Sequence, residues 1–217
     1  MAFTALLLLA VLLQCITLGG GYLVFVHLRY TIAALLYRAT TDKLTGVPNR
    51  DEAEKQLKVQ LANGTALGVA FVDVDDFKAI NDTYSHHAGD AALRYVAARL
   101  NEAADPYMVA RYSGDEFLII LDAGGLYVAE VIAHAVLRRI EETPFIYFGR
   151  TIPIKVSIGV AVADDTSDPD ELLRRADHAM YQAKRNDHMN PVTWMPGMTM
   201  PEPTPETRRT FRDAPTR

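Results

Sequence analysis

The chain has 217 residues, 22 of them basic and 27 acidic, and a formal net charge of -5. This balance leaves no basic stripe of the kind that nucleic-acid binders show, so we expect no DNA or RNA partner. A single cysteine excludes an intrachain disulfide framework.

The N-terminal stretch is apolar and has no Asp, Glu, Lys or Arg between Phe3 and Leu28. It predicts a transmembrane anchor over residues 1–28, because about 20 apolar residues cross a bilayer. A cleaved signal peptide is the alternative, but "MAFT" has no positive charge and no A-x-A cleavage site follows. Arg29 and Arg38 come after the span, so the positive-inside rule predicts a single-pass protein of the cell inner membrane with a cytoplasmic C-terminal domain. Residues 29–41 are then expected to form a stalk helix.

Residues 42–190 predict one domain in which helices and strands alternate. The elements follow from apolar periodicity and from caps such as Asn49 and Asp168. In chain order they are a helix between Asn49 and Gly64, a strand over 66–75, a helix over 90–103, a hairpin of strands 107–112 and 116–122, a helix over 126–142, a strand over 151–163 and a helix over 168–185. This order indicates an α/β (α+β) fold of the ferredoxin-like βαββαβ type with extra helices, preceded by the one transmembrane helix. In that topology the first strand and the second hairpin strand are antiparallel neighbours.

Residues 191–217 hold six of the eleven prolines and show no amphipathic period. This composition predicts a disordered tail. Docking of Trp194 and the nearby methionines on the domain or on a partner is the alternative.

Acidic residues distant in sequence are expected to meet at one edge of the predicted sheet. Asp73 ends the first strand in "FVDVDDFK", and Asp115 and Glu116 begin the strand after the Ser-Gly pair in "RYSGDEF". Convergent carboxylates repel one another unless a cation lies between them. Mg2+, or Mn2+ in its place, accepts oxygen ligands and leaves positions for the phosphates of a nucleotide. The alternative is that Asp73 caps a helix and that the other two acids lie in a solvated turn.

Five stretches resemble the GGDEF family of diguanylate cyclases, in the same order and spacing, over about residues 40–186. They are "DKLTGVPNR", "FVDVDDFKAINDTYSHHAGDAAL", "RYSGDEF", "VSIGVA" and "ADHAMYQAKR". A five-residue signature alone is weak evidence, whereas five ordered matches are specific. The resemblance implies that residues 42–190 form a GGDEF-type domain with a nucleotide-cyclase palm.

The resemblance also implies a role for each matching residue. Asp73, Asp115 and the carbonyl of Val74 would hold the metal ion. Lys78 and Lys184 would bind phosphates. The resemblance makes three of the matching residues catalytic. Asp115 or its metal-bound surroundings would help to deprotonate the attacking hydroxyl, with Glu116 in a supporting role, and Lys78 would neutralise phosphate charge.

Three further residues match the guanine side of the family's site. Asn81 and Asp90 match the guanine readers, and His86 matches a substrate-side histidine. An Asp carboxylate pairs with the N–H groups of guanine, whereas adenine presents an acceptor at that edge and leaves the carboxylate unpaired.

The implied reaction joins two GTP molecules into cyclic di-GMP with loss of two pyrophosphates, and it requires a homodimer because each domain holds one GTP. The chain departs from the family at Ala104 and Tyr107, where a product-inhibition motif is expected, at His188, which replaces an arginine, and at Ser113. Two alternatives stay open. One is a degenerate domain that binds a nucleotide without turnover, and the other is a membrane scaffold.

Overall fold

The computed structural model describes residues 2–64, 66–122, 124–164, 168–185 and 190–198, except for the side chains of residues 2–20. The helices are α1 (Ala2–Thr40), α2 (Arg50–Ala62), α3 (Phe77–Tyr84), α4 (His86–Ala104), α5 (Gly125–Glu142) and α6 (Pro169–Arg185). The strands are β1 (Gly68–Val74), β2 (Met108–Ser113), β3 (Glu116–Leu121), β4 (Phe145–Tyr147), β5 (Arg150–Ile152), β6 (Val156–Val162) and β7 (Val192–Thr193).

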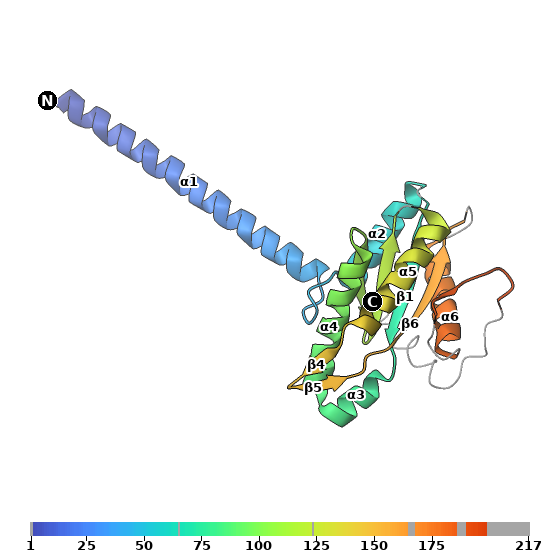
Figure 1. Cartoon of the computed structure of the whole chain (residues 1–217). Helices are drawn as coiled ribbons and strands as arrows, with labels where there is room; N and C mark the ends of the chain where they lie inside the picture. Colours follow the sequence, from blue (N-terminus) through green and yellow to red (C-terminus); the bar gives the residue numbers. More distant parts are fainter. Residues whose placement is uncertain (1, 65, 123, 165–167, 186–189, 199–217) are drawn as a thin grey trace, which may run out of the picture.

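The domain is built on a five-stranded sheet in the order β2-β3-β1-β6-β7. Figure 1 shows two of its neighbouring strands, β1 and β6. β1 is central and runs antiparallel to both β3 and β6. The predicted pairing of the first strand with the second hairpin strand is therefore confirmed, and with it the mixed α/β palm-like fold. β4 and β5 form a separate two-stranded hairpin.

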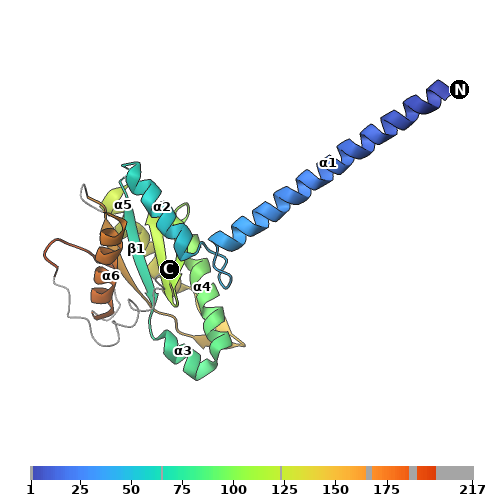
Figure 2. The same ribbon diagram turned by 180° about the vertical axis from the view of Figure 1, so that it is seen from behind.

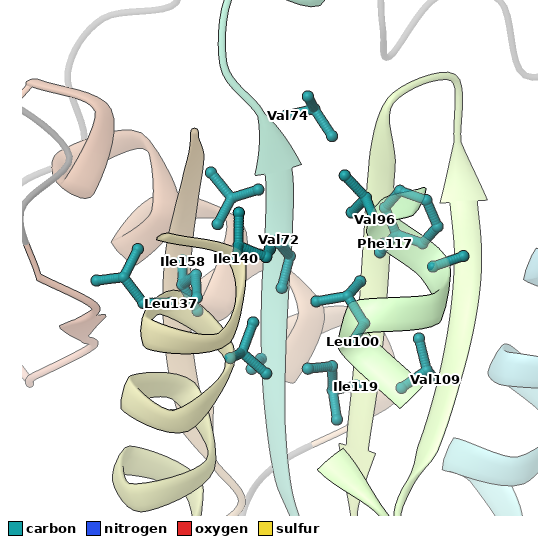
Figure 3. Close-up of a cluster of buried hydrophobic side chains, with 14 of the residues drawn as sticks. Val72, Val74, Val96, Leu100, Val109, Phe117, Ile119, Leu137, Ile140 and Ile158 are labelled. Atoms are coloured by element: carbon teal, nitrogen blue, oxygen red, sulfur yellow. The ribbon is translucent and has the colours of Figure 1, made fainter. Parts of the chain in front are cut away.

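Two hydrophobic layers lie on opposite faces of the sheet, because successive side chains of a strand point to opposite sides. Val72 and Val74 of β1 pack with residues of α4 and α5, and Figure 3 shows this layer. Val69 and Phe71 pack on the other face with residues of α2 and α6. The same alternation places Asp73 on the face covered by α2 and α6.

α1 extends away from the domain as one long helix (Figures 1 and 2). Among the described residues, no helix combines the length and the apolar character needed to cross a membrane. The predicted transmembrane anchor over residues 1–28, and the inner-membrane location that rested on it, are thus corrected. Where side chains of α1 are described, over 21–40, His27 lies within the apolar run, and Arg29 and Arg38 follow it. The side chains of 1–20 lie outside the described part.

The folded domain continues beyond residue 190, where the tail was predicted to begin. β7 runs parallel to β6, with Gly159 paired with Val192, and the Trp194 N–H donates to the Val160 carbonyl at 2.7 Å. The Arg175 guanidinium of α6 lies 4.3 Å from the centre of the Trp194 ring. Trp194 is thus docked on the domain, which was the alternative to a disordered tail for this segment. Residues 199–217 lie outside the described part of the chain.

Candidate active site

The C-terminal end of β1 meets the start of β3 where the acidic residues were expected to converge. Asp73 pairs with Glu116 across the two strands, so both side chains lie on the face covered by α2 and α6. The Val74 N–H donates to the Asp115 carbonyl at 3.2 Å. The structure therefore brings together Asp73, Val74, Asp115 and Glu116.

Lys184 reaches this cluster from the last turn of α6. Its Nζ lies 2.5 Å from Asp73 Oδ1. α6 can pack this close to the sheet because Gly159 of β6 has no side chain: a Cβ there would lie 2.0 Å from the Met180 backbone nitrogen. The absence of a side chain at Gly159 thus lets α6 lie where Lys184 can contact Asp73.

The site raises the pKa values of its two central carboxyl groups. Burial raises the pKa of Asp73 to about 6, against the lowering effect of Lys184. Burial also raises the pKa of Glu116 to about 7, and the negative charges of Asp73, Asp177 and Asp115 add to the increase. Such carboxyl groups exchange protons near neutral pH, as a general base must.

Asp177 belongs to the electrostatic surroundings of the site, although the sequence analysis gave it no role. It lies on α6 two turns before Lys184, so both side chains are on one face of the helix. Burial raises its pKa, which His178 and Lys184 lower. The spacing of seven residues between Asp177 and Lys184 is the sequence signal that could have identified it.

The turn that carries Asp115 is braced by an arginine that the sequence analysis also left without a role. Arg111 donates from Nε and Nη2 to the Gly114 carbonyl, at 2.9 and 2.7 Å. Its Nη1 lies 3.1 Å from Asp42 Oδ1. Burial opposes ionisation of Asp42, but hydrogen bonds from Thr45 and Arg111 hold the pKa of Asp42 below its usual value.

Ser113 lies outside the bend of this turn. It pairs with Glu116 across the hairpin, so the two loop residues are Gly114 and Asp115. Gly114 has a φ of 44°, and Ser113 is not among the residues with positive φ. The glycine thus takes up the unusual backbone conformation, and Ser113 is exposed at the end of β2, where its φ is not positive.

The predicted nucleotide-binding residues lie on α3, α4 and α6. Lys78 and His86 are exposed, whereas Asn81 and Asp90 are half-buried. Asn81 lies against Gly89, the residue before Asp90. His188 lies outside the described residues.

The protein resembles known proteins over the same region. A family model described as "Diguanylate cyclase, GGDEF domain" matches residues 39–190. Diguanylate cyclase DgcP of Pseudomonas aeruginosa is 34% identical over 155 residues, which are 68% of this chain and 23% of that protein. Response regulator PleD of Caulobacter vibrioides is 38% identical over 168 residues, which are 73% of this chain and 37% of PleD.

A solved structure has the same fold. The crystal structure of the coiled coil and GGDEF domain of DgcB from Caulobacter crescentus, in complex with c-di-GMP, matches with a TM-score of 0.75 and 28% identity. The match covers 81% of this chain and 96% of that one. The chain spans well under half the length of DgcP and PleD, which contain further sequence. The family model, these relatives and the shared fold show that the chain belongs to the GGDEF family of diguanylate cyclase domains.

Proposed function

We propose that the protein is a diguanylate cyclase that condenses two GTP molecules into cyclic di-GMP and two pyrophosphates. The observation that carries the proposal is the pairing of Asp73 with Glu116 beside Lys184. Two carboxylates with raised pKa values and a lysine at one end of a sheet suit the transfer of a charged phosphoryl group.

The donor atoms fit a divalent cation. Asp73, Asp115 and the Val74 carbonyl offer hard oxygen ligands, which Mg2+ and Mn2+ accept. Among the described residues, no three His, Cys, Asp or Glu side chains form a ready-made metal centre, so phosphate oxygens of GTP would complete the coordination. A bound cation would neutralise phosphate charge and favour the ionised form of Asp73.

The remaining proposed residues bind the substrate. Lys78 and Lys184 attract the phosphates, and Asn81, Asp90 and His86 lie on the helices α3 and α4, which would hold the guanine. A carboxylate at Asp90 selects guanine because it accepts from the guanine N–H groups.

Glu116 accepts the proton of the 3′-hydroxyl, with Asp115 beside it in the chain. The freed oxygen bonds to the α-phosphorus of the second GTP, the bond from that phosphorus to the pyrophosphate oxygen breaks, and pyrophosphate leaves. A second transfer in the opposite sense closes the ring. Because a domain with one such site holds one GTP, two chains must face each other, and we propose a homodimer.

The test incubates the full chain with GTP and Mg2+ and measures cyclic di-GMP and pyrophosphate. We expect both products in a ratio of one to two, and their loss in Asp73→Asn. A chain that binds GTP but forms neither product contradicts the proposal and indicates a nucleotide-binding module.

A further inference from the structure

The corner between α3 and α4 is compact, because Ser85 alone separates the two helices. The Ser85 N–H donates to the Asn81 carbonyl at 3.0 Å. The Ser85 carbonyl in turn accepts from the N–H groups of Ala88 and Gly89, at 3.0 and 3.1 Å. The backbone thus fixes the end of α3 against the first turns of α4.

Gly89 lies in this corner with no free space around its Cα. A Cβ on Gly89 would lie 2.0 Å from Asn81 Oδ1 and 2.9 Å from Asn81 Cγ. It would also lie 3.1 Å from Phe77 Cζ. The Asn81 amide therefore occupies the volume that a side chain at position 89 would need.

We propose that Gly89 is a specificity-determining positioning residue, whose missing side chain seats the Asn81 amide. This inference rests on the proposed function, in which Asn81 and the adjacent Asp90 bind guanine. A side chain at position 89 displaces the amide from the surface that faces the base. The GTP site then loses the hydrogen bonds that separate guanine from adenine.

The atoms that a Cβ at position 89 would meet determine the effect of a substitution there. Asn81 Oδ1 is the end of a flexible side chain, so the amide can rotate away while the helices stay in place. Alanine in a helix interior is otherwise more favourable than glycine. Gly89→Ala should therefore preserve or raise stability and still impair recognition, a combination that a purely structural role for Gly89 does not produce.

The experiment compares the full-length wild type with Gly89→Ala, Asn81→Ala and the double variant. Calorimetry measures binding of GTP and of ATP with Ca2+ in place of Mg2+ to suppress turnover, and thermal unfolding gives Tm. Gly21→Ala is the matched control, since Gly21 is also helical and a Cβ there meets nothing within 4 Å.

We expect Gly89→Ala to weaken GTP binding about tenfold, the equivalent of one lost pairing. Its preference for GTP over ATP should fall, and its Tm should be unchanged or higher. In the Asn81→Ala background the same substitution should leave GTP affinity unchanged, because the displaced amide is already absent.

Two results overturn the inference while leaving the proposed function intact. One is that Gly89→Ala binds GTP as tightly as the wild type and prefers GTP over ATP to the same degree. The other is an equal loss of affinity in both backgrounds, which assigns the effect to Phe77. A wild-type chain that binds neither nucleotide overturns the proposed function and this inference with it.

Discussion

Lys184 Nζ lies 2.5 Å from Asp73 Oδ1 and joins the end of α6 to the end of β1. The Asp73 side chain is 8% exposed and that of Lys184 is 37% exposed. Burial alone would favour the neutral carboxyl, and the ammonium group offsets part of this effect. The lysine thus keeps a buried acid closer to its ionised form.

Lys184→Gln should lower kcat/KM for GTP about 100-fold, or about 2.7 kcal/mol, because the site loses a cation that faces both the acids and the incoming phosphates. Steady-state release of pyrophosphate measures this change. Lys58→Gln, at an exposed lysine of α2, is the control and should match the wild type. Wild-type kinetics in Lys184→Gln would contradict the role given to the ion pair.

Without divalent cations, the contribution of Asp73 and Glu116 to stability should fall as the pH rises from about 4 to about 7. Asp73 and Glu116 have folded pKa values of about 6 and about 7, above their ordinary values of 3.8 and 4.5. The folded state therefore binds more protons than the unfolded state in this window, and raising the pH favours unfolding. Glu116→Gln should reduce the difference in unfolding free energy between pH 5 and pH 8 by about 2–3 kcal/mol. Urea unfolding at the two pH values is the measurement, and parallel pH curves for both proteins would rule out the raised pKa of Glu116.

Arg111→Ala should lower turnover about tenfold and stability by about 1–2 kcal/mol, because the Gly114 carbonyl and Asp42 lose charge-assisted partners. A double-mutant cycle with Asp42→Asn should show non-additive effects, since the two side chains form one ion pair. Arg139→Ala is the matched control: Arg139 pairs with Glu102 on the surface, and its loss should cost under about 1 kcal/mol without affecting turnover. Additive effects of the two substitutions would show that the Arg111–Asp42 ion pair does not support the turn that carries Asp115.

Ser113→Gly should change turnover by less than about tenfold, whereas Asp115→Ala should abolish it. Gly114 carries the positive φ, so the serine has no backbone strain to relieve, while Asp115 supplies a proposed metal ligand. Product formation by both variants and the wild type checks the pair. If the wild type forms no product and Ser113→Gly forms cyclic di-GMP readily, the domain has lost its catalytic activity and acts as a nucleotide-binding module.

The sheet and the meeting of the acids could be predicted because they depend on local patterns. Buried strands such as "GVAFVDV" are long apolar runs, and the Ser-Gly-Asp sequence marks the end of the first hairpin strand and the turn before the second, which starts with Glu116. Once Asp73 and Glu116 belong to neighbouring antiparallel strands, their proximity follows from topology.

Other features depend on contacts that no local pattern encodes. β4 and β5 have three residues each, too few to show a period. Arg111 pairs with Asp42, which is 69 residues away in the sequence. A single sequence contains no pattern that indicates a contact between residues so far apart. Ser85 adopts a φ of 124°, a conformation typical of glycine. Ser85 lies in the tight α3–α4 corner, which forms only when both helices are packed.

β7 determines where the chain can be shortened. A chain ending at residue 190, the limit of the family match, would lose both β7 and Trp194. β6 would become an open edge whose Val160 carbonyl no longer receives the Trp194 N–H, and unpaired strand edges promote association between copies. Such a chain should aggregate more readily than one ending at residue 198, because only the longer chain covers the edge of β6.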